Sequence, residues 1–146
     1  MGYDVELRPR DATPLTLERY KERFAKWLPR HPGATHPDEK PEVRLRYVDD
    51  FIYPGGGIIS VFECKNVPAG VTASARLSWS DNADSVRRIA RQLAELAERV
   101  SADLYICNER VEAGEEEKIV EDFSRCRRSI GSIFGTINVK GPGISG

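Results

Sequence analysis

The residues best suited to metal or acid–base chemistry lie together in one short segment. Both histidines, His31 and His36, stand among prolines and a glycine, and Asp38 and Glu39 follow them. Imidazole and carboxylate groups are common metal ligands, so this segment could form a clamp around a metal ion. However, metal ligands must be held by surrounding structure, and a segment rich in Pro and Gly offers little such support. We therefore expect a solvated loop here, with no metal ion and no other cofactor.

The three cysteines, Cys64, Cys107 and Cys126, indicate reduced thiols rather than a disulfide scaffold or a zinc site. Their number is odd, they lie far apart, and none stands in a paired spacing. This usage is typical of a cytoplasmic protein. A serine or cysteine nucleophile would also need a base, which only the histidine segment could supply. The sequence therefore favours a protein without enzymatic activity, and it predicts no catalytic residue.

Charge and composition argue against two classes of partner. The 146-residue chain carries 22 Lys and Arg against 23 Asp and Glu, a net charge of −1. A dedicated nucleic-acid-binding protein usually has a clear basic excess, so no nucleic-acid partner is expected. No apolar run approaches the roughly 20 residues of a membrane-spanning helix, so we expect no membrane partner. The glycines of 55–57 lack the Lys-Ser/Thr and the helix that follow a phosphate loop, and they predict a turn.

The segment Asp49–Tyr53 is the candidate binding site. It contains two acids and two aromatic residues between a polar strand and the glycine triplet. Aromatic residues beside acids in a turn are typical of protein interfaces, where the rings supply binding energy and the acids steer a basic partner. Alternatively, the two rings fold back over the sheet. If the protein acts by binding, we expect the contact at Asp49, Asp50, Phe51 and Tyr53.

Apolar and polar residues alternate in several short segments, which is typical of half-buried strands. The longest alternation runs over nine residues, from Val71 to Trp79. Near the N-terminus, Tyr3, Val5 and Leu7 alternate with charged residues. The predicted strands are 3–8, 43–47, 58–64, 71–79 and 104–107.

Three other segments place their apolar residues along one side of a helix. In the second, apolar residues from Val86 to Val100 share one face, and Ser80, Asp81 and Asn82 are possible N-caps. In the first, Pro29 ends the helical pattern. The predicted helices are 16–28, 83–101 and 115–134, and the predicted core residues are Leu17, Tyr20, Phe24, Trp27, Ile89, Leu93, Leu96, Val100, Phe123 and Ile130.

The order of these elements, β-α-β-β-β-α-β-α, predicts an α+β fold. We expect a mainly antiparallel sheet with the helices packed mostly on one face. The order contains the pattern of a ferredoxin-like or split βαβ domain, with an extra strand and a C-terminal helix. One domain should cover residues 1–137, and residues 138–146, which contain three glycines and a proline, should form a flexible tail.

Several stretches of the chain also resemble a group of known proteins. These stretches are Met1–Val5, Ala75–Ser80, Val86–Val100 and Asp103–Tyr105. Together they are similar to a diffuse set of small, uncharacterised bacterial α+β proteins, some of which resemble immunity or accessory proteins of competition systems. The resemblance implies a small bacterial protein that binds another protein.

Two classes of function remain open. The first is a non-enzymatic domain of immunity or accessory type that binds another protein, with a homodimer as a further option. The second is a small-molecule-binding or catalytic domain on a ferredoxin-like frame. A deep pocket with convergent polar groups would favour the second class, and an exposed surface of aromatic and acidic residues would favour the first.

Overall fold

The computed structural model describes residues 2–31, 47–53 and 57–140, and within these ranges it leaves out the side-chain surroundings of 47–49 and 131–140. Several expectations fall outside the described residues. They are the histidine segment from residue 32 onward with His36, most of the strand predicted at 43–47, the glycines at 55 and 56, and residues 141–146 of the predicted tail.

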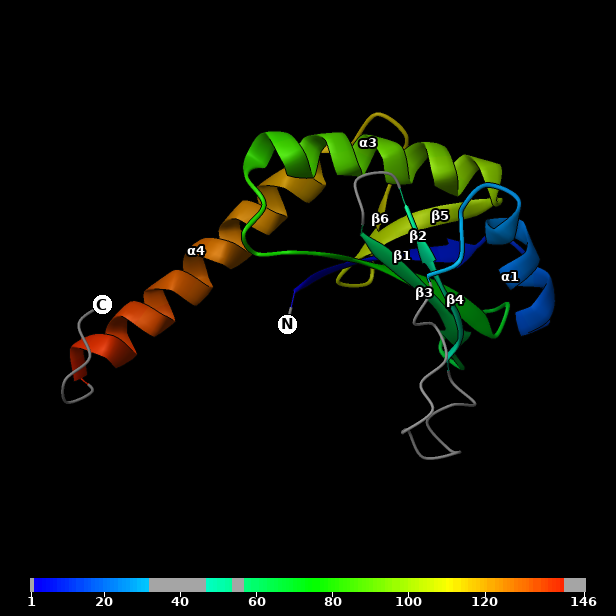
Figure 1. The fold of residues 1–146 in the computed structure, drawn as a ribbon, viewed down its shortest axis with the longest axis horizontal. Helices are drawn as coiled ribbons and strands as arrows, with labels where there is room; N and C mark the ends of the chain where they lie inside the picture. The colour runs from blue at the N-terminus through cyan, green and yellow to red at the C-terminus, as the bar shows by residue number, and fades with distance from the viewer. Residues whose placement is uncertain (1, 32–46, 54–56, 141–146) are drawn as a thin grey trace.

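The described chain folds as an α+β protein with one six-stranded antiparallel sheet and three helices (Figure 1). The strands lie in the order β2-β3-β4-β1-β5-β6, and every neighbouring pair is antiparallel, which confirms the α+β class and the antiparallel sheet. The strands are β1 (Tyr3–Pro9), β2 (Tyr47–Ile52), β3 (Ile58–Glu63), β4 (Val71–Leu77), β5 (Ala102–Ile106) and β6 (Glu109–Val111). The helices are α1 (Leu17–Ala25), α3 (Ala83–Arg99) and α4 (Glu117–Lys140).

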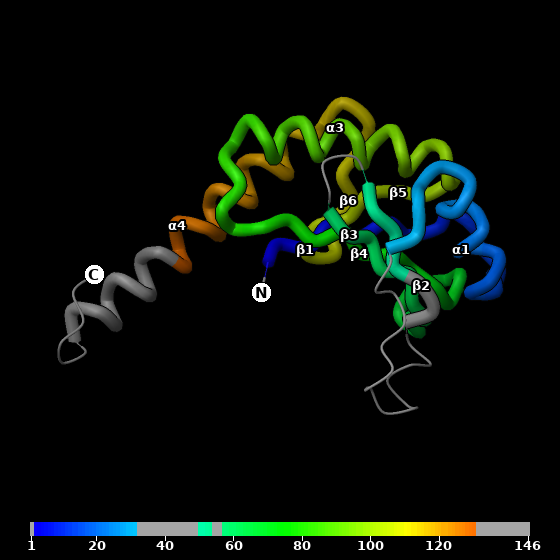
Figure 2. The backbone as a smooth tube through the Cα atoms, in the orientation of Figure 1, coloured from blue at the N-terminus to red at the C-terminus, as the bar shows by residue number. Residues whose placement is uncertain are grey.

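β1 lies in the middle of the sheet, as the backbone path in Figure 2 shows. It pairs with β4 on one side, where Val5 lies opposite Ala75, and with β5 on the other, where Glu6 lies opposite Tyr105. Successive strand residues point to opposite faces, so the alternation in β1 separates a buried side from a polar one. The buried side of β1 contains Tyr3, Val5 and Leu7, and the polar side contains Asp4, Glu6 and Arg8.

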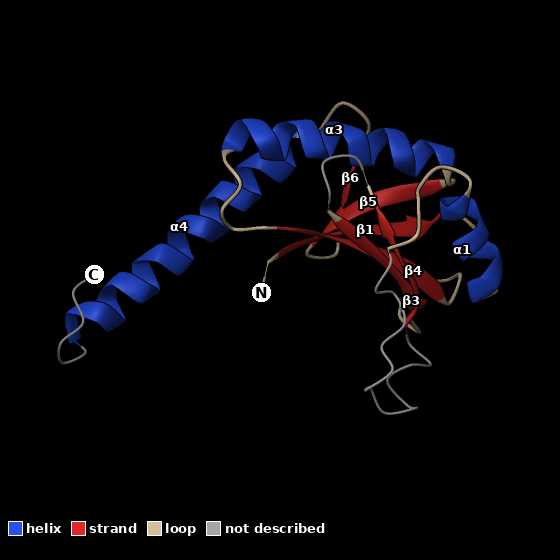
Figure 3. Cartoon of the chain, viewed as in Figure 1, coloured by secondary structure: helices blue, strands red, loops and turns tan. Residues whose placement is uncertain are grey.

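The hydrophobic core is one cluster that joins the buried side of β1 to the helices. α3 runs along the sheet, as Figure 3 shows, and Val86, Ala90 and Leu93 of this helix are fully buried. Asn82 caps α3, because its Oδ1 accepts a hydrogen bond from the Ser85 backbone N–H at 2.9 Å. Of the predicted core residues, Tyr20, Phe24, Leu93, Leu96, Val100 and Phe123 are buried, and Leu17, Ile89 and Ile130 are half-buried.

The prediction that Trp27 belongs to the core is wrong. α1 ends at Ala25, before the residue where the helical pattern was expected to stop. Trp27 therefore lies beyond the end of the helix rather than on its buried face, and half of its surface is exposed (50%). The Arg99 guanidinium lies over its ring, 4.7 Å from the centroid.

Of the two interpretations of the segment Asp49–Tyr53, the exposed aromatic turn is wrong, and the alternative, in which the two rings fold back over the sheet, is confirmed. Asp50 and Phe51 belong to β2, where Phe51 lies opposite Ile59 of β3. Phe51 is fully buried and stacks on Phe24 of α1, with ring centroids 6.0 Å apart. Tyr53 is buried as well, and its hydroxyl donates a hydrogen bond to the Arg76 carbonyl at 3.2 Å. The two rings thus fold back into the core, because α1 packs against β2 and supplies an apolar surface for them.

The structure contains one strand, β6, that the sequence did not predict, and its last helix, α4, is longer than predicted. β6 pairs with β5 through a two-residue turn at Cys107 and Asn108, whose φ angles of 48° and 66° are typical of a type I′ hairpin turn. The usual Asn-Gly or Asp-Gly signal of this turn is absent, so the hairpin was not recognised. α4 continues to Lys140, so residues 138–140, predicted as part of the tail, are helical.

Candidate functional site

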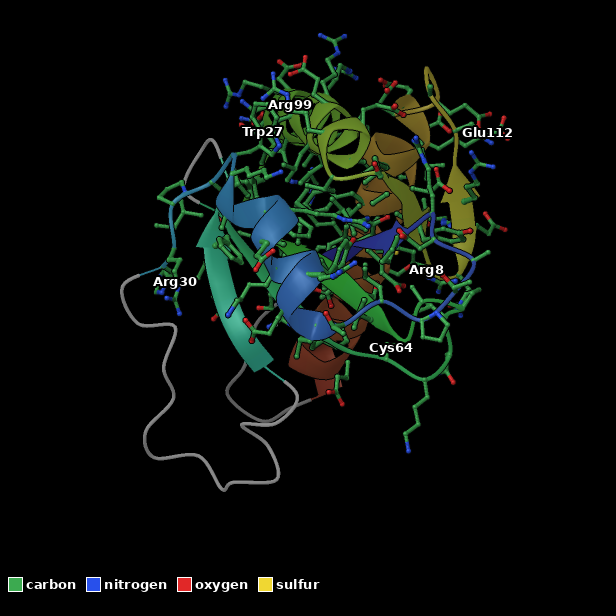
Figure 4. The ribbon with its side chains drawn as sticks, turned by 90° about the vertical axis from the view of Figure 1, so that its right-hand side faces the viewer. Arg8, Trp27, Arg30, Cys64, Arg99 and Glu112 are labelled. Carbon is green, nitrogen blue, oxygen red and sulfur yellow. The ribbon has the colours of Figure 1, made fainter. Side chains whose placement is uncertain are left out.

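The polar side of β1 forms the floor of a large groove. The groove has a volume of about 770 Å³ and extends from the strands to one side of α4. Glu6 and Arg8 of β1, Ser74 of β4 and Tyr105 of β5 line it, because alternate residues of neighbouring strands point to the same face. In Figure 4, Arg8 and Cys64 mark two points of its lining.

Arg8 is held in one position within this groove. Its Nε and Nη2 atoms donate hydrogen bonds to the two carboxylate oxygens of Glu6, at 2.8 and 3.0 Å. Nη2 also donates to Asn108 Oδ1 at 2.6 Å, and the guanidinium lies 4.1 Å from the centroid of the Tyr105 ring. The hydrogen bonds to Glu6 raise the pKa of Arg8 further above its usual value. These contacts come from β1, β5 and the β5–β6 turn, so the position of Arg8 depends on the pairing of these strands.

Glu6 is fixed from a third direction by the neighbouring strand. The Thr72 hydroxyl of β4 donates a hydrogen bond to Glu6 Oε2 at 2.8 Å. The same hydroxyl lies 3.3 Å from the Leu7 carbonyl, and the residue is buried. Thr72, Glu6 and Arg8 therefore form a continuous hydrogen-bond network across β4 and β1, and such a network fixes the positions of its side chains.

Aromatic side chains form the wall of the groove near α4. Trp79 stacks on Phe123 of α4 with ring centroids 5.2 Å apart, and Tyr3 meets both rings edge to face. The Tyr3 hydroxyl donates a hydrogen bond to Asp122 Oδ2 at 2.6 Å, and burial together with this carboxylate raises the pKa of Tyr3 well above its usual value. Trp79 Nε1 is buried without a hydrogen-bond partner in the described residues. The wall is therefore largely apolar, and its one buried donor without a partner in the described residues is the Trp79 indole N–H.

All three cysteines line the same groove, although they are far apart in the sequence. Cys64 follows β3, Cys107 lies in the β5–β6 turn and Cys126 belongs to α4. None of the three forms a disulfide, and Cys107 is exposed while burial raises the pKa of the Cys126 thiol. In the described part of the chain, no group of three or more His, Cys, Asp or Glu residues is placed to hold a metal ion. The sequence offered no signal for this convergence, because the spacing of the cysteines has no pattern.

The residues predicted as a binding site lie elsewhere. The lining of the groove includes none of Asp49, Asp50, Phe51 and Tyr53. Asp50 and the two rings are buried around β2, and the Asp49 side chain is not described. His31 hydrogen-bonds through its backbone N–H to the Asp50 carbonyl at 2.9 Å, so the start of the histidine segment runs beside β2 rather than beside the groove. A binding role for Asp49–Tyr53 stays a prediction, but without exposed rings as its anchors.

A second cavity, of about 390 Å³, lies between α3 and the β5–β6 hairpin. Some of its charged residues form ion pairs: Arg10 donates hydrogen bonds to Glu98 at 2.5 Å and to Asp103 at 2.9 Å. Arg110 also reaches Asp103, at 3.4 Å. The cavity is smaller than the groove and has no aromatic residue in its lining. The larger groove is therefore the better candidate for a functional site.

Comparison with known proteins finds no family model, curated protein or solved structure that matches this chain. In the residues that the structure describes, no helix is both long and apolar enough to cross a membrane.

Proposed function

We propose that this protein is a small-molecule-binding domain without catalytic activity, and that its ligand occupies the groove on the polar side of β1. The observation that carries this proposal is the fixed position of Arg8 in a groove of about 770 Å³. Sites for small ligands commonly have volumes of roughly 300–1,000 Å³, with a few well-placed polar groups in a mostly apolar lining.

The chemistry of the lining supports binding rather than catalysis. The described lining contains no histidine, and its carboxylates Asp4 and Glu6 each form an ion pair with an arginine. A carboxylate that already accepts charge-assisted hydrogen bonds is a poor general base, because proton uptake would break them. The groove can hold and orient a ligand, but these groups are not poised for proton transfer.

A bulky residue in the floor of the groove tests the proposal, and an exposed loop residue offers a control. Ser74 of β4 lines the groove, whereas Thr13 is exposed in the loop before α1 and lies outside the lining. Ser74→Trp should abolish binding of compounds selected from a chemically diverse small-molecule library, whereas Thr13→Trp should leave their affinity within about twofold. If Ser74→Trp binds the selected compounds as well as the wild type does, or if the library yields no binder, the proposal is wrong.

Binding of another protein is a second candidate function, and Trp27 is the observation that favours it. Among the described residues, it is the one large hydrophobic side chain that is exposed, and it lies beside Arg99 at the top of Figure 4. Tryptophan and arginine are enriched at the energetic centres of interfaces. A partner recovered with wild-type protein should then be lost with Trp27→Ala. Its retention would exclude this surface.

We also propose that the inner strands form a ferredoxin-like, split βαβ unit. The strand order supports this relation, because α3 connects β4 to β5 and β1 lies between these two strands. In the same way, the connection from β1 to β3 contains α1, and β4 lies between them. β2 and β6 would then be additions at the two edges of the sheet.

A further inference from the structure

We infer that the groove selects an uncharged ligand that carries hydrogen-bond acceptors next to an apolar or aromatic part. This inference rests on the proposed function, because it specifies the ligand class of the same groove. Three features of the lining carry it: the pairing of its charges, the hydrogen-bond donors that remain, and its aromatic wall.

Every charged side chain in the described lining of the groove already has a partner of opposite charge. Two of these side chains are acidic and two are basic, so the lining itself has no net charge. The pairs are Asp4 with Arg76, Glu6 with Arg8, and Arg125 with Asp122.

This pairing disfavours charged ligands. An ion that enters the groove must give up part of its hydration, and this cost is recovered only where an opposite charge is available. Arg8 is the most enclosed charged group of the lining, with 20% of its side chain exposed, and Glu6 already holds it with two hydrogen bonds. An anion would have to compete with Glu6, and a cation would have to compete with Arg8. A neutral ligand has to compete with neither Glu6 nor Arg8, and it gives up less hydration on entering the groove.

The polar groups that remain in the lining can donate hydrogen bonds. The Nη1 atom of Arg8 makes no hydrogen bond within the described residues, so both of its N–H groups are open to an acceptor. The hydroxyls of Ser74 and Tyr105 are likewise without a hydrogen-bond partner in the described part of the chain. An amide or other carbonyl oxygen satisfies such donors without adding charge. The rings of Tyr3 and Trp79 then provide an apolar surface for the remainder of the ligand.

Benzamide, benzoate and benzamidine test this inference, because they share a ring and differ mainly in charge. Each would be added at equal millimolar concentration to the full chain at neutral pH, with binding followed by the Arg8 Nε–H and the tryptophan indole N–H signals in ¹⁵N NMR spectra. Benzamide should shift the Arg8 and Trp79 signals, with an affinity at least tenfold above that of benzoate or benzamidine. Trp27, outside the groove, provides an indole signal that should not move.

Glu6→Gln should change the selectivity in a direction that a structural role alone would not produce. The amide keeps the size of the side chain but leaves the Arg8 charge unpaired, so benzoate should gain at least tenfold in affinity and bind more tightly than benzamide. Glu98→Gln is the matched control, because it removes the same charge and a partner of Arg10 outside the groove; it should leave the selectivity unchanged. If Glu6→Gln does not fold, Asp4→Asn, which also leaves the lining with an excess positive charge, is expected to shift selectivity in the same direction.

The outcomes separate the ligand class from the proposed function. If benzoate or benzamidine binds wild-type protein as tightly as benzamide does, or if none of the three shifts the groove signals, the inferred ligand class is wrong. The same holds if Glu6→Gln folds and does not gain affinity for benzoate. The proposed function is decided separately by the comparison of Ser74→Trp with Thr13→Trp, which does not depend on the charge of the compounds.

Discussion

Replacement of Phe51 by alanine should destabilise the protein strongly, whereas replacement of Trp27 should have little effect. The structure buries Phe51 completely and leaves half of Trp27 exposed. The sequence pattern predicts Trp27 in the core and leaves the environment of Phe51 open, so the structure reverses the first prediction and decides the second. A comparison of the two alanine variants tests the packing of α1 against β2 directly.

The size of the Phe51→Ala effect follows from its surroundings. A fully buried phenylalanine usually costs about 3–5 kcal/mol when it is truncated to alanine, since apolar burial is lost and a cavity remains. The loss includes the stacking contact with Phe24, whose centroid lies 6.0 Å away. β2 lies at the edge of the sheet, where β3 is its one strand neighbour and its other side carries only an isolated bridge from Arg30 to Phe51. The site can therefore partly collapse, and the lower end of the range applies. About 3 kcal/mol, or roughly 6–12 °C in the thermal midpoint, is expected for a chain of this size.

Trp27→Ala provides the control within the same part of the fold. Its main described contact is the Arg99 guanidinium, and a cation–π contact at an exposed site contributes roughly 0.5–1 kcal/mol. Both variants should be followed by far-UV circular dichroism in urea and on heating, because loss of Trp27 would alter a fluorescence signal. Equal destabilisation of the two variants, or a larger effect of Trp27→Ala, would refute the described packing.

Two further predictions concern buried tyrosines. Tyr20→Phe should lower the free energy of unfolding by about 1–2 kcal/mol, measured by urea denaturation, because the buried Tyr20 hydroxyl donates a hydrogen bond to the Leu7 carbonyl at 2.6 Å; an unchanged midpoint would contradict this contact. Burial raises the pKa of Tyr53 to about 12, from about 10 in an unfolded chain. Between these pH values the folded chain holds more protons than the unfolded one, so stability should fall as pH rises from 10 to 12. Tyr53→Phe should make this decline shallower, and an equally steep decline would argue against the burial of Tyr53.

The sequence predicted those elements whose signals are local. The alternation of apolar and polar residues in β1 and β4 reflects strands with one buried side, and the structure has both strands where the pattern places them. The sequence predicted α3 equally well, because its apolar face and its candidate N-caps, which include Asn82, lie within one contiguous segment. The sequence did not predict β6, because this strand has only three residues and its turn has Cys107 in place of the common turn residues.

Tertiary packing decided the environment of residues outside regular patterns. Phe51 and Trp27 are both aromatic residues next to a turn signal, and nothing in their immediate neighbours separates a buried ring from an exposed one. The difference arises because α1 ends at Ala25 and packs against β2. Contacts of this kind depend on the whole sheet, so periodicity alone could not predict them.

The groove shows the same division between local and long-range information. The sequence by itself determined that Asp4, Glu6 and Arg8 share one face of a strand. Only the strand order β4-β1-β5 brings Thr72 within 2.8 Å of Glu6 and Asn108 within 2.6 Å of Arg8, over separations of 66 and 100 residues. Side-chain periodicity is a property of neighbouring residues, whereas a binding groove is formed by residues that meet only after the strands have paired.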